Sequence, residues 1–481
     1  MVSDLKSQTL KPREWGIFSK VMKKIPFLFL SLLLFACSKK EPIAEFWLTD
    51  PKEGILFQQL TEDLDDNDSE LIIQVDPETT YQNMDGFGFT LSQGSAKHLL
   101  EMSDSARIAV LKELFGNGEK DIRISYLRLA VAASDLNEFP FSYNDLEDSL
   151  ATDLSLENFS LSYDTLDVIP VLKQILEINP EIKLMASPWS PPKWMKDNND
   201  TRGGSLLEEF EPVYAQYLVK YIREMEKRGF NIDALTIQNE PLHPGNNPSL
   251  FMLPIQQARF VGQHLGPAFK NEGIKTKIVT YDHNADRPDY PISILNDSLA
   301  NPFVDGSAFH LYGGQIEALS EVHQAFPDKN IYFTEQWVGA PGNLEEDIPW
   351  HVKNLLIGAP RNWAKTVLEW NLSSNPSLTP HTDRGGCDRC LGAVTIDGDQ
   401  VTRNPAYYVI AHASKFVDPG SFRIDSNVFE GLSNVAFLRP DGKKVLIALN
   451  DSSKPISFKI QEKEKVIFAS LNPGATGTWV W

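Results

Sequence analysis

The sequence predicts an α/β fold: a (β/α)₈ TIM barrel with an attached β-sandwich domain built from N- and C-terminal segments. First, eight apolar, β-rich runs alternate with amphipathic, helix-like segments from about residue 83 to residue 417, as parallel βαβ units require. Second, short strand-like runs separated by turn residues follow from about residue 420, which is typical of a sandwich. Third, strand-like runs without helices precede the alternating region, and we expect them to pair with the C-terminal module.

The candidate barrel strands are residues 83–91, 124–132, 183–189, 234–240, 277–283, 304–312, 331–337 and 365–372. Between them apolar residues recur every three or four positions, as in 166–178 and 211–229, which predicts helices with one buried face. The last predicted helix is 407–417. An open doubly wound sheet is the competing architecture, but it predicts a G-x-G-x-x-G turn after an early strand, and GFGF at 86–89 lacks that spacing.

These patterns divide the chain into five expected parts. They are a lipoprotein signal segment at 1–37, a tether at 38–45, N-terminal strands of the sandwich at 46–80, the barrel at 81–418 and the C-terminal sandwich at 419–481.

Charge excludes some partners. The chain of 481 residues has 65 acidic and 45 basic residues, a net charge of −20. Because nucleic acid requires a basic surface to meet its phosphates, we exclude it as a partner. The same negative charge disfavours electrostatic adhesion to an anionic membrane. Most of this charge is explained by solubility, because like-charged molecules repel one another.

The N-terminus has the pattern of a secretory signal. Lys23 and Lys24 precede twelve mainly apolar residues, 25–36, which are too few for a membrane-spanning helix of about 20 residues. LFAC at 34–37 resembles a bacterial lipobox, whose cysteine is lipidated and becomes the new N-terminus. We therefore expect an exported protein that is lipid-anchored in a bacterial envelope through Cys37, with Met22 as the candidate start. A buried core helix is the alternative, which the flanking lysines and the polar residues after Cys37 disfavour.

Two further cysteines, Cys387 and Cys390, lie in the sequence GGCDRC. In an oxidising compartment such a pair is most simply a local disulfide, and free thiols are the alternative. A zinc site needs two more ligands, and only His381 lies close by in the sequence. A redox pair of the thioredoxin type needs a βαβ setting near it.

Polar and aromatic residues gather at the ends of the predicted strands. In a barrel of parallel strands these ends meet at one rim, where enzymes of this fold carry their chemistry. The residues at this rim are Arg128, Asp135, Trp189, Asn239, Glu240, Asp282, His283, His310, Tyr312, Glu335, Gln336, Trp337, Trp370 and Asn371. His283 gives the weakest signal and is not included among the predicted site residues.

Two glutamates at one rim, Glu240 and Glu335, are the minimal machinery for hydrolysis of a glycosidic bond. One carboxyl group must hold its proton near neutral pH, and the other must stay ionised to attack the anomeric carbon of the sugar. Asn239 is placed to bind a sugar hydroxyl, and His310 and Tyr312 are placed to orient a carboxylate.

Each member of this set also has an ordinary explanation. A glutamate at a strand end is usually a surface charge. A single tryptophan such as Trp189 or Trp370 is more often a packing residue than a surface on which the apolar face of a pyranose stacks. Arg128 and Asp135 together fit a structural ion pair. The prediction depends on the coincidence of the whole set at consecutive strand ends.

The chain also resembles glycoside hydrolase family 30 of clan A, which includes glucosylceramidases and β-1,6-glucanases. The motifs that carry the resemblance are DGFGFTLSQGSA, RLAVAASDLN, ASPWSPPKWMK, NEP, FHLY, TEQW, EWNL and the closing strands up to TWVW. The resemblance extends from about residue 46 to residue 481. Family members commonly have the sequence GFGGAFTDAAA where this chain has GFGFTLSQGSA. We therefore do not assign to this chain the contact that this loop makes in the family.

The resemblance implies that Glu240 is the acid/base and Glu335 the nucleophile. It also implies that seven residues line or support the site for the sugar being transferred: Arg128, Asp135, Trp189, Asn239, His310, Tyr312 and Trp370. The family uses no metal and no organic cofactor, and its members combine a barrel with a β-sandwich from both termini.

We therefore expect a retaining β-glycosidase that acts by double displacement, with the two carboxyl groups about 5–5.5 Å apart. The expected substrates are β-glucosides such as β-1,6-glucan. Glucosylceramide is the alternative substrate, for which a large exposed apolar entrance is expected. A carbohydrate-binding lipoprotein without activity is the alternative from another class, which the intact pair of glutamates disfavours.

Overall fold

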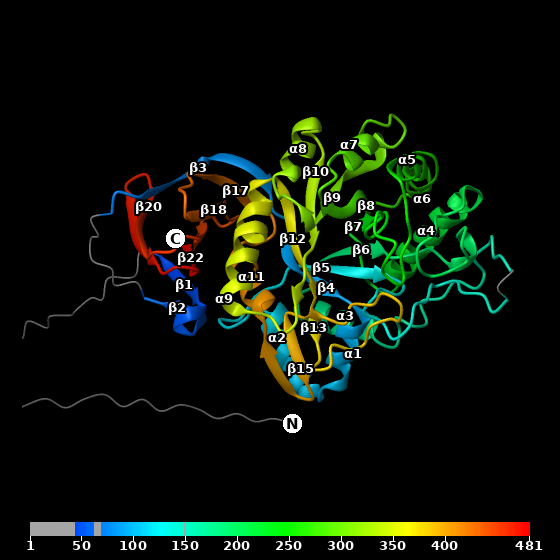
Figure 1. Cartoon of the computed structure of the whole chain (residues 1–481), viewed down its shortest axis with the longest axis horizontal. Coiled ribbons are helices and arrows are strands. Elements are labelled where there is room, and N and C mark those ends of the chain that lie inside the picture. Colours follow the sequence, from blue (N-terminus) through cyan, green and yellow to red (C-terminus); the bar gives the residue numbers. More distant parts are fainter. Residues whose placement is uncertain (1–43, 62–68, 149–150) are drawn as a thin grey trace, which may run out of the picture. The chain divides into compact units, whose positions relative to one another are not determined.

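The computed structural model describes residues 44–61, 69–148 and 151–481. Eight parallel strands form a closed barrel in the order β10-β12-β4-β5-β6-β7-β8-β9 (Figure 1). They are β4 (Gly86–Leu91), β5 (Tyr126–Val131), β6 (Lys183–Pro188), β7 (Ala234–Thr236), β8 (Lys277–Ala285), β9 (Val304–Gly314), β10 (Asn330–Glu335) and β12 (Ala364–Asn371). The predicted barrel is confirmed.

Seven of the predicted strands agree with the structure to within three residues at each end. The eighth, predicted at 234–240, is wrong beyond Thr236 because the chain leaves the regular strand conformation there. Residues 237–240 keep some backbone hydrogen bonds to neighbouring strands, such as that from the amide of Asn239 to the carbonyl of Pro188 at 2.8 Å.

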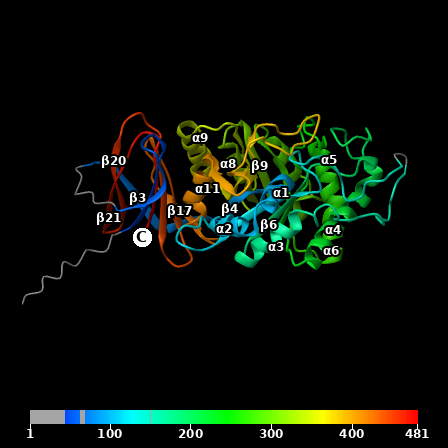
Figure 2. The same cartoon turned by 90° about the horizontal axis from the view of Figure 1, so that it is seen from below.

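Helices cover the outside of the barrel (Figure 2). They are α1 (Gln93–Glu101), α2 (Asp104–Phe115), α3 (Val168–Ile178), α4 (Glu211–Lys227), α5 (Pro254–Arg259), α6 (Gly266–Glu272), α7 (Asp289–Leu295), α8 (Ala318–Ala325), α9 (Leu344–His351), α10 (Ala359–Arg361) and α11 (Pro405–Ser414). Ser92 caps α1 by accepting a hydrogen bond from the amide of Ser95, which satisfies one of the free donors at the helix start. π-Helical turns at 260–265 and 352–358 join α5 to α6 and α9 to α10.

Side chains fill the inside of the barrel. Seven strands each contribute one residue to a buried apolar cluster: Tyr126, Met185, Ala234, Val279, Ala308, Tyr332 and Leu368. At the N-terminal ends of the strands, the carboxylate of Asp85 forms ion pairs with Lys183, Lys277 and Lys365. This end of the barrel is therefore closed, and the opposite end is the one available for chemistry.

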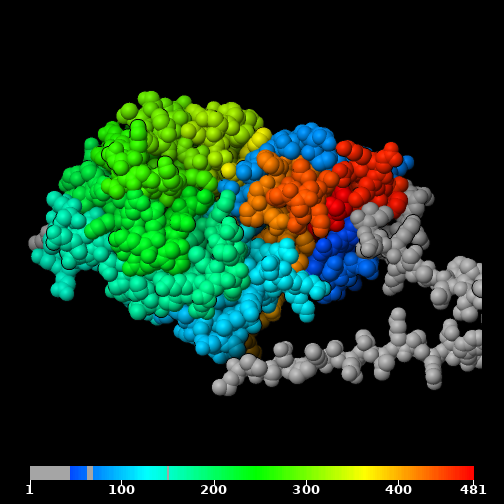
Figure 3. All heavy atoms as spheres, turned by 180° about the vertical axis from the view of Figure 1, so that it is seen from behind, coloured from blue at the N-terminus to red at the C-terminus, as the bar shows by residue number. Residues whose placement is uncertain are grey.

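The second module contains strands from both ends of the chain. Nine strands follow one another by hydrogen bonding in the order β2-β1-β22-β19-β18-β17-β3-β20-β21. They are β1 (Glu45–Asp50), β2 (Ile55–Leu60), β3 (Ile72–Asn83), β17 (Phe422–Ser426), β18 (Leu432–Leu438), β19 (Lys444–Asn450), β20 (Ile456–Glu462), β21 (Lys465–Leu471) and β22 (Thr476–Val480). In Figure 3 the blue N-terminal and the red C-terminal residues accordingly lie side by side.

The long strand β3 connects the two layers of this sandwich. It pairs antiparallel with β17 and, at residues 72–74, parallel with β20. Side chains of both layers meet in one core, in which Trp479 packs against Phe46 at 4.8 Å and Phe458 at 5.6 Å between ring centroids. The predicted sandwich of N- and C-terminal segments is confirmed.

Helix α11 connects the sandwich to the barrel. Its buried His412 bonds Thr49 on β1 and Thr478 on β22, each at 2.8 Å. Among the described residues, no helix combines the length and the apolar character needed to cross a membrane.

Candidate active site

The C-terminal ends of the barrel strands surround a cavity of about 390 Å³. It is lined by Asp135, Trp189, Asn239, Glu240, His243, Asn246, His283, Asn284, Tyr312, Glu335, Trp337, Trp370, Gly385, Gly386, Cys387 and Cys390. Seven of the nine predicted site residues are in this lining. The other two, Arg128 and His310, are completely buried and contact the two glutamates of the cavity. Cys37 lies outside the described residues.

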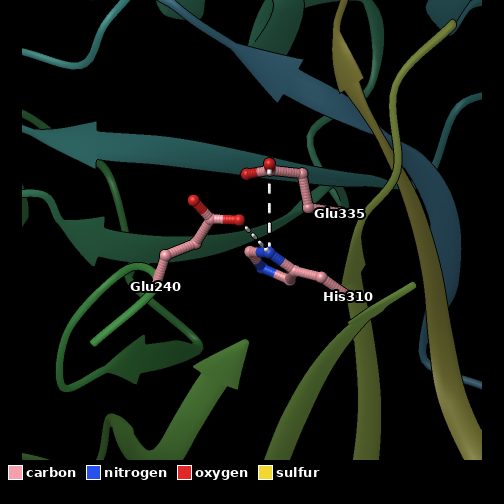
Figure 4. A group of neighbouring side chains, drawn as sticks. All are labelled: Glu240, His310 and Glu335. Atoms are coloured by element: carbon pink, nitrogen blue, oxygen red, sulfur yellow. Dashed lines mark hydrogen bonds and ion pairs between the residues drawn. The ribbon is translucent and has the colours of Figure 1, made fainter. Parts of the chain in front are cut away.

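Glu240 and Glu335 face each other beside His310 (Figure 4). One oxygen of each carboxyl group and a ring nitrogen of His310 all lie within 4.8 Å of one another. Nδ1 of His310 is 3.2 Å from Oε1 of Glu240 and 3.9 Å from Oε1 of Glu335. This short separation suits direct attack by one carboxylate, because inverting enzymes place their carboxyl groups about 6.5–9.5 Å apart to admit a water molecule.

Glu240 has an unusual backbone conformation. Its φ is +47°, in the left-handed region that side chains other than glycine seldom adopt, and Tyr281 and Asp282 at the neighbouring strand end share this feature at +73° and +63°. The amide of Glu240 donates to the carbonyl of Asp282 at 2.9 Å. Such conformations cost about 1–3 kcal/mol each and occur mainly where function requires them. The irregular end of β7 thus points the acid into the cavity.

Arg128, on β5, is the centre of a buried hydrogen-bond network. One of its terminal nitrogens contacts Oε2 of Glu335, and the other lies 2.7 Å from Asn239 Oδ1 and 2.8 Å from Asp282 Oδ2. The arginine therefore pairs with Glu335 and Asp282, and the alternative of an ion pair with Asp135 is wrong for the described structure. Since a guanidinium keeps its charge in proteins, Glu335 always has a cation beside it.

Asp282, which the sequence placed at the rim without a role, supports this network. Its carboxylate accepts hydrogen bonds from Arg128, His310 and the hydroxyl groups of Ser187, Thr236 and Thr334. Burial acts to raise the pKa of Asp282, but the charge of Arg128 and these bonds hold it well below its usual value. Asp282 is therefore a fixed anion beneath the cavity.

His310 lies between Asp282 and Glu240. Burial acts to lower its pKa, but the charge of Glu335 and the bonds to Asp282 and Glu240 outweigh this and raise the pKa of His310 to about 9. The imidazole is therefore a cation at neutral pH. Both of its ring nitrogens contact carboxylates, so a metal ion between Glu240, His310 and Glu335 would have to displace one of these contacts.

The two catalytic carboxyl groups are close enough for their titrations to be coupled. Burial, opposed by the charges of His310 and Arg128, raises the pKa of Glu335. Burial acts on Glu240 in the same direction, but the hydrogen bond and charge of His310 outweigh it and lower the pKa of that carboxyl group. These directions are the reverse of those expected for an acid at Glu240 and a nucleophile at Glu335, so the two roles depend on the family resemblance and on the contact of Glu335 with Arg128, and not on the pKa shifts.

Asp135 is a further buried acid of the cavity. Burial, followed by the negative charge of Glu335, raises the pKa of Asp135 to about 8. The carboxyl group is therefore mostly protonated at neutral pH and can donate a hydrogen bond to a sugar hydroxyl. Tyr312 donates to Glu335 Oε1 at 3.0 Å, and thus helps to orient that carboxylate as predicted.

Trp189 and Trp370 form an aromatic wall with ring centroids 5.4 Å apart. Arg128 lies beneath both rings, at 4.8 Å and 5.9 Å from their centroids. Cys387 and Cys390, whose state the sequence left open, form a disulfide that packs beside this wall. Cys390 and Leu391 form β14, which pairs with β11 (Val338–Gly339) after β10.

Sequence reasoning missed several lining residues. His243, Asn246 and Asn284 follow the strands without a pattern that marks them, and His283 was set aside. Asn246 donates to Oε2 of Glu240 at 3.0 Å. Gly385 and Gly386 directly precede the predicted disulfide motif, so GGCDRC was the one available signal for that side of the cavity.

Comparison with known proteins gives a consistent result. Residues 84–417 match the model of the glycosyl hydrolase family 30 TIM-barrel domain, and residues 420–479 match that of the family 30 beta sandwich domain. The chain is 31% identical to an endo-1,6-beta-D-glucanase of Aspergillus fumigatus, over 83% of this chain and 85% of the relative. It is 30% identical to the lysosomal acid glucosylceramidase of Mus musculus, over 85% of this chain and 83% of the relative.

A solved endo-β1,6-glucanase structure is also similar, with a TM-score of 0.84, 32% sequence identity and coverage of 91% of this chain and 99% of that one. The family models cover most of the chain, and both glutamates of the predicted pair lie in the matched barrel. The chain belongs to glycoside hydrolase family 30 and is a glycosidase.

Proposed function

We propose that this glycosidase hydrolyses β-1,6-linked glucan with retention of the anomeric configuration. The observation that carries the mechanism is the pair of glutamates within 4.8 Å, one in contact with Arg128 and the other with His310. The support for the substrate is similarity of about 30% to endo-1,6-beta-D-glucanases over most of their length.

The reaction proceeds in two displacements. Glu335, oriented by Arg128 and Tyr312, attacks the anomeric carbon and forms a covalent glycosyl ester. Glu240 gives its proton to the departing oxygen, so the leaving group departs as a neutral alcohol. Water then attacks the ester while Glu240 takes a proton from it, which regenerates Glu335 as a carboxylate.

Covalent trapping tests this assignment. An activated 2-fluoroglucoside should inactivate the enzyme and add one glycosyl group to Glu335, as peptide mass spectrometry would show. Glu335→Gln should lower kcat by at least about three orders of magnitude, since an amide is no nucleophile. Label on any other residue, or an α-anomer as the first product in NMR, would remove the mechanism proposed here.

Glucosylceramide remains the second candidate substrate. A relative that is a glucosylceramidase is 30% identical, and a second cavity of about 360 Å³ has an apolar rim that includes the exposed Phe139, Tyr163 and Leu166. The loop after β5 contributes Asp135 to the catalytic cavity and Asn137 to the second one. Parallel assays with gentiotriose and glucosylceramide decide between the two substrates.

We further propose that the enzyme is exported and lipid-anchored at Cys37. This proposal depends on the basic, apolar and lipobox-like order of residues 23–37, which lie outside the described residues. Metabolic labelling with a fatty acid should mark the wild type and not Cys37→Ala, and an unlabelled wild type would overturn the proposal.

A further inference from the structure

The cavity has a distinct side next to the acid. In double displacement the leaving group departs past the residue that protonates it, which here is Glu240. Its Oε1 contacts His310, and its Oε2 accepts from Asn246, which belongs to the loop after β7. The residues beyond Oε2 therefore meet the leaving group, whereas Arg128, Trp189 and Asp135 belong to the side of the sugar being transferred.

His283 on this side has no hydrogen-bond partner among the residues that the structure describes. It is 6% exposed and lines the cavity, and its Nδ1 is buried without a partner. Burial lowers the pKa of His283 to about 4, so the ring is neutral at pH 7 and offers one donor and one acceptor. The other buried histidines of the described chain each have at least one hydrogen bond: His98, His310, His351 and His412.

A buried polar group without a partner requires an explanation, because nearly all such groups in proteins are paired. A structural role does not account for His283, since a hydrocarbon side chain would fill the same space without leaving polar atoms unsatisfied. Nδ1 itself has no exposed surface, so a ligand in the cavity meets the ring through its other nitrogen, Nε2, which has no hydrogen bond among the described residues.

The neighbours of His283 are polar as well. His243 is exposed, with its ring over Gly245, where a Cβ atom would come within 2.9 Å of it. Asn246 and Asn284 are half-buried and complete this part of the lining. His243 and His283 line the same cavity as Glu240. This group of imidazoles and amides contains no aliphatic side chain.

We infer that His243, Asn246 and His283 form a binding subsite for a leaving group that is itself a sugar. Hydroxyl groups both donate and accept, which matches the polar groups of imidazoles and amides, whereas the alkyl chains of a ceramide match neither. The inference rests on the proposed function and deepens it, because it selects a sugar over a lipid as the group that leaves.

The experiment measures kcat/KM for gentiotriose, whose leaving group is a sugar, relative to 2,4-dinitrophenyl β-glucoside. His283→Phe keeps an aromatic ring and removes the hydrogen bonds, so it should lower this ratio by about tenfold, the effect of one hydrogen bond in a buried site. His243→Ala at the exposed position should lower it about threefold, and its exposure avoids a folding defect.

His323→Phe is the matched control. His323 stacks on Trp363 at 3.8 Å between ring centroids, on helix α8 outside the cavity, and the same substitution there should leave the ratio unchanged. If both site variants keep the wild-type ratio, the subsite is wrong. Faster cleavage of glucosylceramide than of gentiotriose by the wild type would also overturn it. A wild type without activity on any β-glucoside would instead contradict the proposed function, before any variant is compared.

Discussion

The charges of individual residues in this site depend on their partners more than on their residue types. Asp282 and Asp135 are both buried acids at strand ends, yet the pKa of Asp282 lies well below its usual value and that of Asp135 is raised to about 8. Burial acts to raise both pKa values, but direct contacts with Arg128 and His310 outweigh it at Asp282, whereas the negative charge of Glu335 adds to it at Asp135. One acid is therefore a permanent anion and the other a proton donor to the ligand.

This contrast predicts the alkaline side of the pH profile. As the pH rises through about 8, Asp135 loses its proton beside Glu335, so kcat/KM should fall. Asp135→Asn keeps a donor and cannot ionise, and the fall should then move toward the pKa of about 9 of His310, whose proton the Glu240–His310 pair needs. The measurement is kcat/KM for an aryl β-glucoside between pH 5 and pH 10. An unshifted alkaline limb in the variant would assign the fall to another group.

At the scale of elements, the segment 378–391 forms part of the cavity wall through Gly385, Gly386, Cys387 and Cys390. The amide of Thr382 donates to the carbonyl of Asp135 at 3.0 Å, and Asn247 donates to Asp383. The carbonyl of Arg389 accepts from the amide of Ala340 at 2.8 Å, so the segment is attached to loops after β5, β7 and β10. The disulfide Cys387–Cys390 lies at its end beside Trp370.

Removing this disulfide should affect the site more than the fold. In the loop-closure model, a ring of so few residues contributes about 2 kcal/mol, which acts on the segment and not on the barrel. Cys387→Ser with Cys390→Ser should therefore raise KM about threefold to tenfold and leave the midpoint of thermal unfolding nearly unchanged. A reductant should raise KM of the wild type similarly and have no effect on the variant. If KM is the same for the wild type and the variant, each with and without reductant, the disulfide does not shape the cavity.

Strands were predictable because their apolar runs are local signals, and the boundaries differ mainly where tertiary contacts intervene. In β7 the apolar run continues to Ile237, but the regular pairing with β8 stops at Thr236, and Glu240 beyond it adopts a left-handed conformation. Glu240 and Glu335 were predictable because barrel strand ends converge. The supporting role of Asp282 and the contacts of the segment 378–391 were not, because they join residues far apart in sequence.

At the scale of the whole molecule, the chain places its two ends in one sandwich and connects this sandwich to the barrel through α11. Thr49 and Thr478 come from opposite ends of the chain, and both are completely buried beside His412. Burial lowers the pKa of His412 to about 3, so the neutral ring donates one hydrogen bond and accepts another. The contact therefore ties the first and last strands to the catalytic module.

Breaking this contact should destabilise the protein. His412→Phe removes both hydrogen bonds of the ring, at about 0.5–1.5 kcal/mol for each lost bond. The Thr49 hydroxyl keeps its bond from the amide of Phe57, and the Thr478 hydroxyl keeps its bond to the backbone carbonyl of residue 412. The loss should be fully present above pH 6.5 and should shrink toward pH 3, because the unfolded wild type binds a proton in this range that the folded state does not. Urea unfolding at pH 7 and pH 5 measures both effects. His412→Gln should lose less stability at pH 7 than His412→Phe, since a side-chain amide can donate to one hydroxyl group and accept from the other. A glutamine variant as unstable as His412→Phe would mean that the shape of the ring, and not its hydrogen bonds, holds the two modules together.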